Sequence, residues 1–133
     1  MPPTVNCCRI GGEIPPGWDV RDPGEIDAVV DDCRIVFMLF YSDNCRECVE
    51  VESAYVEVAE RYSGNIAFLR VNVDRMTEVA EALGIRGVPS LVLVMDGEVI
   101  GYRDGYVDEE ELELIAMESL KEAGCTNSSY SLV

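Results

Sequence analysis

Two cysteines three residues apart, Cys45 and Cys48, are the residues of this chain best suited to covalent chemistry. They follow an unbroken apolar run over residues 35–41 and a short polar stretch, and they open a segment with helical periodicity. The run has the length of a strand and is rich in β-branched and aromatic side chains, which is typical of a strand buried on both faces. We therefore expect the cysteine pair to lie where a buried strand turns into a helix.

That position favours a reactive sulfur. The first N–H groups of a helix have no partner within the helix and carry partial positive charge, which stabilises a thiolate. A free cysteine with a pKa near 8.5 is only about 3% ionised at pH 7, whereas redox-motif cysteines are roughly half ionised. The spacing and the position together indicate a nucleophilic dithiol.

A metal site is the main alternative for a pair of this spacing. A zinc site needs four ligands, usually a second Cys-x-x-Cys or two histidines, but the chain has no histidine, and Cys7 and Cys8 are adjacent. An iron–sulfur cluster would need four well-spaced cysteines. We therefore predict no metal. The absence of histidine also excludes enzymes that use a Cys–His or Ser–His nucleophile.

The length and composition indicate one domain with an acidic surface. The 133 residues are 48% hydrophobic, which is enough for a core, and 26 acidic against 10 basic residues give a net charge of −16. This charge argues against nucleic acid and anionic membranes as partners, because both are polyanions. No apolar run is long enough to span a bilayer, and the N-terminus does not resemble a secretory signal, so we expect a cytoplasmic protein.

The order of predicted elements gives an α/β fold. Residues 1–16 are rich in proline and glycine and are predicted to form an extended arm, residues 17–124 the domain, and residues 125–133 a flexible tail. Strands are predicted at 17–20, 35–41, 66–73, 91–95 and 98–102, and helices at 24–32, from the cysteine pair to Gly64, at 76–83 and at 108–124. Parallel strand–helix–strand units come first and a hairpin comes last, which predicts one mixed sheet with helices on both faces.

Local signals mark the ends of these elements. Asp22-Pro23 and the pair Asp108 and Glu111 are typical of helix starts, and Gly124 is typical of a helix end. Asp96-Gly97 is typical of a tight hairpin turn. The helix after the cysteine pair is predicted to carry a core-facing stripe of Val51, Tyr55, Val58 and Tyr62.

Several motifs in this order and spacing resemble the thioredoxin family. The segments concerned are 40–48, 72–74 (Asn-Val-Asp), 84–91 and 96–98, and Pro89 follows Cys48 by 41 residues. The resemblance runs from about Trp18 to Gly124. It implies the thioredoxin fold, with a central mixed five-stranded sheet covered by helices on both faces.

The same resemblance implies a thiol–disulfide oxidoreductase. Cys45 would attack a substrate disulfide as a thiolate, and Cys48 would then attack Cys45 and release the reduced substrate. The Val88–Pro89 peptide bond would be cis and face the sulfurs, and the backbone of Val88 would pair with an extended substrate segment. The implied partners are disulfide-containing proteins and a thioredoxin-reductase-like electron donor, with no bound cofactor.

Some positions depart from the family pattern. Asn44 replaces an aromatic residue before the first cysteine, and Ser53 replaces a proline after the second. Between the cysteines, Arg46 should stabilise a thiolate and Glu47 should oppose it. These changes keep a second hypothesis open, a thioredoxin-fold binding or adaptor module with vestigial redox activity.

Leu39 is the departure that bears most on the mechanism. It stands where the family has a buried acid that assists proton transfer to the inner sulfur. Deprotonation of Cys48 would then use water or a nearby group such as Glu47 or Arg70.

The other four cysteines have no role in this scheme. Cys33 precedes the buried strand and is predicted to be a small core residue. For Cys7, Cys8 and Cys125 the sequence leaves open a disulfide from the N-terminal segment to Cys125, or a second redox relay through Cys7 or Cys8.

Overall fold

A computed structural model, which describes residues 7–125, contains one five-stranded sheet with the order β1-β3-β2-β4-β5. The strands are β1 (Trp18–Asp19), β2 (Ile35–Tyr41), β3 (Ile66–Asn72), β4 (Ser90–Met95) and β5 (Glu98–Asp104). The helices are η1 (Gly11–Glu13, a 3-10 turn), α1 (Pro23–Asp32), α2 (Arg46–Tyr62), α3 (Thr77–Ala82) and α4 (Glu109–Ala123). The predicted α/β order and the mixed five-stranded sheet are confirmed.

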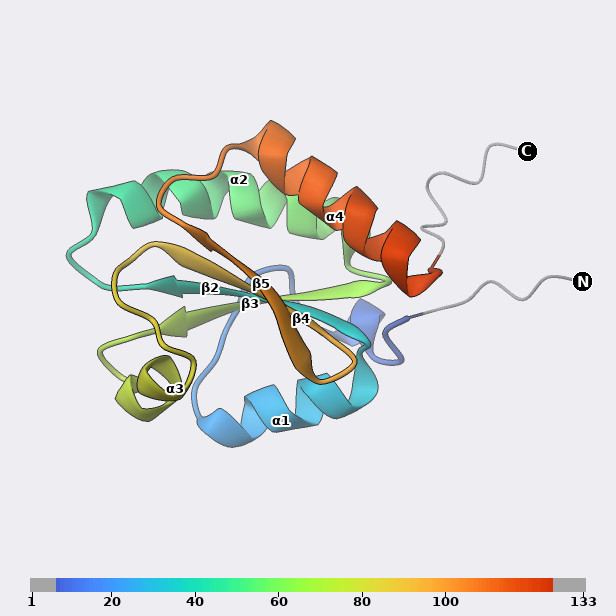
Figure 1. Cartoon of the computed structure of the whole chain (residues 1–133), viewed down its shortest axis with the longest axis horizontal. Coiled ribbons are helices and arrows are strands. Elements are labelled where there is room, and N and C mark those ends of the chain that lie inside the picture. Colours follow the sequence, from blue (N-terminus) through green and yellow to red (C-terminus); the bar gives the residue numbers. More distant parts are fainter. Residues whose placement is uncertain (1–6, 126–133) are drawn as a thin grey trace, which may run out of the picture.

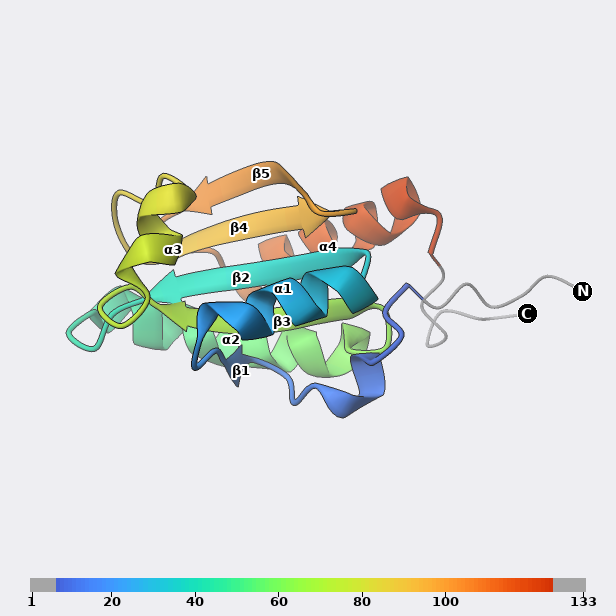
Figure 2. The same ribbon diagram turned by 90° about the horizontal axis from the view of Figure 1, so that it is seen from below.

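The molecule has three layers. Helices α2 and α4 lie along one face of the sheet, and α1 and α3 lie on the other (Figure 1). The view from below shows the strands side by side with α1 crossing in front of them (Figure 2). Two buried clusters fill the space between the layers, one beneath α2 and α4 and one beneath α1 and α3.

Strand β2 forms the centre of the sheet. It is parallel to β3 along its whole length, from the pair Ile35–Ile66 to the pair Tyr41–Asn72, and antiparallel to β4. Six of its seven residues are buried, as expected for a strand with both faces covered.

Helix α2 packs tightly on this strand. Its buried positions include the stripe predicted from the sequence, Val51, Tyr55, Val58 and Tyr62. The Tyr55 hydroxyl lies 2.7 Å from the Leu69 carbonyl oxygen and 3.0 Å from that of Phe37, so it joins the helix to β3 and β2. Burial raises the pKa of Tyr55 well above its usual value, which keeps this hydroxyl a hydrogen-bond donor.

The predicted start and stop signals of the helices are also confirmed. The side chain of Asp22 caps α1 by accepting from the Gly24 N–H at 2.8 Å, and that of Asp108 caps α4 by accepting from the Glu111 N–H at 2.8 Å. Gly124 ends α4 in the left-handed conformation, with φ of 75°. The β4–β5 turn has φ of 52° at Asp96 and 82° at Gly97, as a tight hairpin requires.

The segment before β1 is folded where the structure describes it. Its described part contains η1, and both Cys7 and Cys8 are buried, at 2% and 1% exposure. Residues 1–6 and 126–133 lie outside the described residues, so the predicted boundaries of the arm and of the tail stay predictions.

The remaining cysteines form two disulfides. Cys7 bonds to Cys125, as one of the open alternatives had it, and Cys8 bonds to Cys33. The prediction of Cys33 as a simple core residue is therefore wrong in part: it is buried at 2% exposure, but as half of a disulfide. Since Cys8 forms a bridge of β type to Cys33, the backbone is extended there, and neighbouring side chains point to opposite sides. Cys7 thus joins the cluster beneath α2 and α4, whereas Cys8 joins the cluster beneath α1.

These two disulfides fix the N-terminal segment to distant parts of the chain. They close loops with sequence separations of 118 and 25 residues. Loop-closure entropy predicts about 3–5 kcal/mol of stabilisation for each, through restriction of the unfolded chain. From Cys7 onward the segment is therefore covalently held to the rest of the fold.

Gly11 lets this segment approach the turn between α2 and β3. A Cβ atom at Gly11 would come within 2.8 Å of the Gly64 carbonyl oxygen and nearer still to that of Ser63, both of them backbone atoms that cannot move aside alone. A Cβ atom at the neighbouring Gly12 would meet nothing within 4 Å.

We expect Gly11→Ala to lower the free energy of unfolding by about 1–3 kcal/mol, because the added methyl group has no space. Gly12→Ala is the matched control and should change it by less than about 0.5 kcal/mol. Urea denaturation followed by circular dichroism measures both. Equal values for the two variants would contradict the packing of the N-terminal segment described above.

Candidate active site

Cys45 and Cys48 lie at the junction of β2 and α2, as predicted. Cys45 is the N-cap of α2, and its Sγ accepts a hydrogen bond from the Cys48 N–H at 3.1 Å. The two residues form a disulfide with a Cα–Cα distance of 5.2 Å. Cys45 is half-buried and Cys48 is buried at 3% exposure, so Cys45 is the more exposed of the two.

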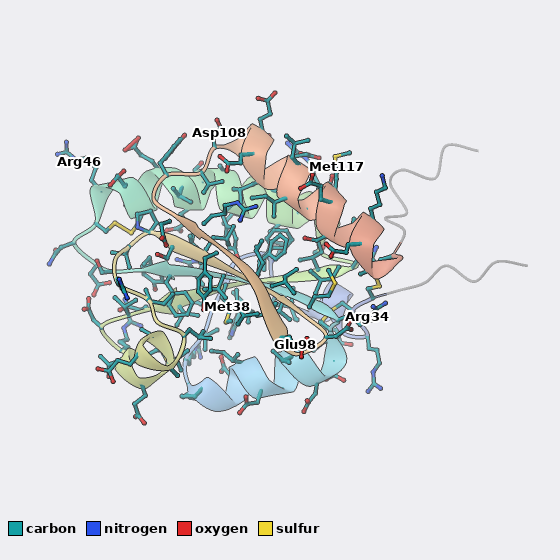
Figure 3. The ribbon with its side chains drawn as sticks, viewed as in Figure 1. Arg34, Met38, Arg46, Glu98, Asp108 and Met117 are labelled. Carbon is teal, nitrogen blue, oxygen red and sulfur yellow. A yellow bond between two sulfur atoms is a disulfide. The ribbon has the colours of Figure 1, made fainter. Side chains whose placement is uncertain are left out.

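The two residues between the cysteines face solvent. Arg46 and Glu47 occupy the first turn of α2 and are both exposed. Figure 3 shows Arg46 projecting from the end of the molecule where α2 begins. None of the described carboxylates forms an ion pair with Arg46.

The position of Leu39 bears on proton transfer. Leu39 is 2% exposed and belongs to the apolar cluster beneath α2, together with Val51 and Tyr55. The buried polar residues among those described are asparagines and serines only, namely Asn65, Asn72, Ser90 and Ser119. No buried carboxylate in the described part of the chain can therefore take a proton from Cys48.

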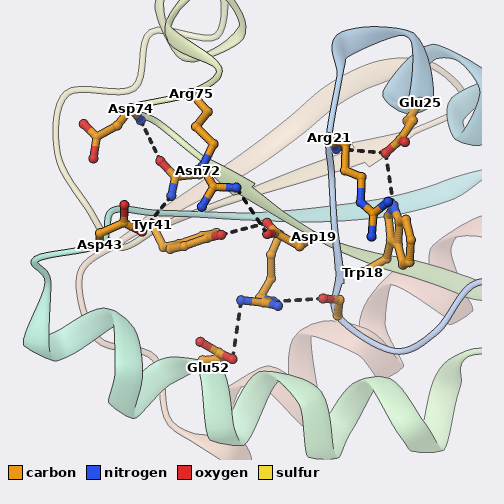
Figure 4. Close-up of polar contacts among 12 residues, drawn as sticks. Trp18, Asp19, Arg21, Glu25, Tyr41, Asp43, Glu52, Asn72, Asp74 and Arg75 are labelled. Carbon is orange, nitrogen blue, oxygen red and sulfur yellow. Dashed lines mark hydrogen bonds and ion pairs between the residues drawn. The ribbon is translucent and has the colours of Figure 1, made fainter.

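Arg70, one of the groups considered for that role, is engaged elsewhere. Its Nη1 lies 3.4 Å from Glu52, its Nε donates to the Gly17 carbonyl oxygen at 2.8 Å, and its guanidinium lies over the Tyr41 ring at 5.3 Å from the centroid. The Tyr41 hydroxyl donates to Asp19 at 2.7 Å. Burial, and then this hydrogen bond, raises the pKa of Tyr41 above its usual value. This network joins β1, β2, β3 and α2 beside the active-site end of the sheet (Figure 4).

Asn72 connects β3 to the loop that carries the cysteines. It is 1% exposed, its Nδ2 donates to Asp43 at 3.0 Å, and its Oδ1 accepts from the Asp74 N–H at 2.8 Å (Figure 4). The sequence motif contained Asn72 but gave it no role. A buried amide at the end of a central strand is the signal that could have found it, because such a group must have partners.

The second part of the site is the loop before β4. The Val88–Pro89 peptide bond is cis, Pro89 is buried and Val88 is half-buried. Since Ser90 pairs with Phe40 across β4 and β2, Pro89 lies beside the end of β2 from which the cysteine loop leaves. The loop also lines a surface groove of about 720 Å³, formed by residues 83–90 together with Tyr102, Asp104 and Gly105.

Among the described residues, no three His, Cys, Asp or Glu side chains cluster as a metal site would require. No described helix is long and apolar enough to cross a membrane.

Comparisons with known proteins agree with this geometry. The family model named Thioredoxin matches residues 22–118. Thioredoxin H2-1 of Oryza sativa is 34% identical over 87 residues, which are 65% of this chain and 62% of the rice protein, somewhat less than two thirds of its length. A thioredoxin of Mycoplasmoides gallisepticum is 26% identical over 94 residues, which are 71% of this chain and 93% of that protein.

A solved structure extends the comparison to the fold. A mutant thioredoxin from Halobacterium salinarum has a TM-score of 0.73 and 33% identity, covering 79% of this chain and 92% of that one. The similarity therefore includes both the cysteine pair and the sheet that positions it.

We expect Asn72→Ala to lower the free energy of unfolding by about 1–3 kcal/mol, because a buried hydrogen-bonding group is lost and the Asp74 N–H loses its partner. Asn44→Ala is the matched control, since Asn44 is exposed and forms no side-chain hydrogen bond among the described residues. Its effect should stay within about 0.5 kcal/mol. Thermal and urea unfolding of the two variants measure the difference. A neutral Asn72→Ala would show that the loop is held in some other way.

Proposed function

The chain belongs to the thioredoxin family of thiol–disulfide oxidoreductases through its Cys45–Cys48 pair, and we propose that it reduces disulfides of partner proteins with Cys45 as the attacking sulfur. The family match confirms the predicted resemblance and the predicted enzyme class. The observation that supports the assignment of Cys45 is its position as N-cap of α2, with its Sγ 3.1 Å from the Cys48 N.

The first step is attack on a substrate disulfide. In the reduced protein, the Cys45 thiolate would be stabilised by the Cys48 N–H and by the partial positive charge of the helix N-terminus. It would form a bond to one substrate sulfur while the substrate S–S bond breaks, and the other substrate sulfur would leave as a thiolate. The product is a mixed disulfide between Cys45 and the substrate.

The second step is resolution. The Cys48 thiolate would attack the Cys45 sulfur, form the Cys45–Cys48 bond that the structure contains, and release the second substrate sulfur. The Cα–Cα distance of 5.2 Å lies within the usual range for a disulfide, so this step needs no rearrangement of the helix. Burial of Cys48 keeps it from competing for the first attack.

Proton transfer from Cys48 differs from the family pattern. Since Leu39 replaces the buried acid and Arg70 is paired with Glu52, the proton would pass to water or to Glu47 at the mouth of the site. Arg46 would help to hold the resulting negative charge at the exposed end of the helix.

The groove beside Pro89 is the proposed binding site for the substrate segment. The Val88 backbone would pair with an extended chain, since a peptide segment can add to exposed backbone groups in the manner of a strand. Tyr102 and Asp104, which also line the groove, would then contact the substrate residues that flank the disulfide.

The family acts on disulfide substrates and receives electrons from reductases in general. For this chain we propose protein disulfides as substrates and a thioredoxin-reductase-like donor, without a bound cofactor. The net charge of −16 supports the further proposal that nucleic acids and anionic membranes are not partners. The cytoplasmic location expected from the sequence stays a prediction.

Replacement of the attacking sulfur tests the mechanism. We expect Cys45→Ser to abolish the catalysed reduction of a protein disulfide by dithiothreitol, because a serine hydroxyl cannot form the mixed disulfide. Turbidity of insulin measures the rate. The double variant Cys7→Ser/Cys125→Ser removes two other sulfurs at the opposite end of the sheet and should retain the catalysed rate.

A rate no greater than the uncatalysed background in the unchanged protein would refute the enzyme assignment and favour the binding-module hypothesis.

Replacement of the resolving sulfur should instead trap an intermediate. We expect Cys48→Ser to accumulate a covalent complex with the substrate at Cys45, because the first step proceeds and the second cannot. Mass spectrometry of the acid-quenched mixture identifies the bonded cysteine. Substrate bonded to the Cys48→Ser variant at any cysteine other than Cys45 would contradict the assigned roles.

A further inference from the structure

The Cys7–Cys125 disulfide lies at the end of the sheet opposite the Cys45–Cys48 pair. The Cys7 carbonyl oxygen accepts from the Arg34 N–H at 2.7 Å, just before β2 begins, whereas Cys45 follows the end of β2. Seven extended residues separate these points by roughly 20 Å. In Figure 3, Arg34 and Arg46 accordingly lie at opposite ends of the molecule. The two disulfides cannot exchange within one molecule, so any chemistry at Cys7–Cys125 must be independent of Cys45.

A guanidinium group lies against one sulfur of this disulfide. Arg34 Nη1 is 3.8 Å from Cys7 Sγ and also donates to the Ala123 carbonyl oxygen at 2.8 Å. Its Nε and Nη2 bind the two carboxylate oxygens of Asp96 at 2.7 and 3.1 Å. Four contacts thus hold the guanidinium in place, although its side chain is 44% exposed. Among the described residues, no other charged side chain lies within hydrogen-bonding distance of either sulfur.

The other sulfur belongs to a residue at the C-terminal end of α4. Cys125 directly follows Gly124, the C-cap of α4, and its N–H donates to the Leu120 carbonyl oxygen at 2.8 Å. Carbonyl groups at the end of a helix carry partial negative charge, which disfavours a thiolate nearby. Cys7 is therefore the sulfur that better carries negative charge.

The two cysteines also differ in their exposure to solvent. Cys125 is 9% exposed, whereas Cys7 is 2% exposed. Both residues are buried, but Cys125 is the less buried of the two, and attack on its sulfur would displace the sulfur that Arg34 contacts. Exchange is faster when the attacked sulfur is the more accessible one and the leaving thiol has the lower pKa.

We propose that Cys7–Cys125 is a second redox-active disulfide, which dithiols open by attack on Cys125 while Arg34 stabilises the departing Cys7 thiolate. The reductant thiolate forms a bond to Cys125 Sγ, the Cys7–Cys125 bond breaks, and its electron pair stays on Cys7. The second thiolate of the reductant then attacks the reductant sulfur of the mixed disulfide and releases Cys125 as a thiolate, which takes a proton from water. Two electrons pass to the protein, and the dithiol becomes a disulfide.

The Cys8–Cys33 disulfide is an internal reference for this reaction. Its sulfurs belong to residues that are 1% and 2% exposed, and no described cationic side chain donates to either of them. Because the two disulfides start from adjacent residues in the same segment, general loosening of that segment affects both.

The first experiment follows the opening of each disulfide in the whole protein. Samples treated with dithiothreitol at pH 7 are quenched with acid, alkylated and assigned by tandem mass spectrometry. We expect Cys7–Cys125 to open at least about ten-fold faster than Cys8–Cys33, because a low leaving-group pKa and access both accelerate exchange. With glutathione, which cannot complete the reduction as readily, we expect the mixed disulfide on Cys125. Equal rates, or glutathione on Cys7, would overturn the proposal.

The second experiment tests Arg34. We expect Arg34→Gln to slow the opening of Cys7–Cys125 by about three- to ten-fold relative to Cys8–Cys33, and Arg34→Lys to stay near the rate of the unchanged protein. Asp96→Asn is the matched control, since it removes the same ion pair but keeps the cation. In this variant Cys7–Cys125 should open as fast as in the unchanged protein, or faster.

A purely structural role of Arg34 would give the opposite result, because loss of its contacts would loosen α4 and accelerate opening. If the opening rate of Cys7–Cys125 relative to that of Cys8–Cys33 is unchanged or higher in Arg34→Gln, the role given to the guanidinium is refuted. Neither experiment depends on catalysis by Cys45, so the result is separate from the test of the proposed function.

Discussion

The pairing of β2 with β3 on one edge and β4 on the other is the interaction on which both ends of the molecule depend. It places Cys45 at the carboxyl end of β2 and brings Pro89, which precedes β4, next to the same end. At the opposite end it fixes Arg34 between the N-terminal segment, α4 and the β4–β5 turn. Burial of the β2 side chains on both faces supplies the main favourable free energy for this arrangement.

The Cys45–Cys48 pair lies apart from the two disulfides that join the N-terminal segment to the rest of the fold. The pair that belongs to the family mechanism lies at an exposed helix N-terminus, where backbone N–H groups favour a thiolate. The other two disulfides lie at the far end of the sheet, one on each side of it. A distance of roughly one strand length separates them from Cys45, so their opening and closing are independent of turnover at the family site.

The core beneath α2 contains no buried carboxylate among the described residues. With leucine at position 39, the core there is apolar, and Arg70 pairs with Glu52 and stacks on Tyr41 near the surface instead. An apolar residue avoids the free-energy cost of burying a carboxylate. In the proposed mechanism, the inner sulfur would therefore depend on exposed groups and water for proton transfer, which would link its reactivity to the charges of Arg46 and Glu47.

The sequence alone determined the features that depend on local patterns. The apolar run predicted β2, the proline and aspartate signals predicted the helix starts, Asp96-Gly97 predicted the hairpin, and the motif spacing predicted the family and its cysteine pair. It did not predict that Cys33 pairs with Cys8, or that Asn72 holds the Asp43 loop. Those contacts join residues 25 and 29 positions apart, and only the packing of the segment before β1 against α1, and of β3 beside β2, brings them together. The same holds for Arg34 and Cys7. In the sequence Arg34 is one arginine among several. Only the tertiary structure places its charge against the Cys7 sulfur.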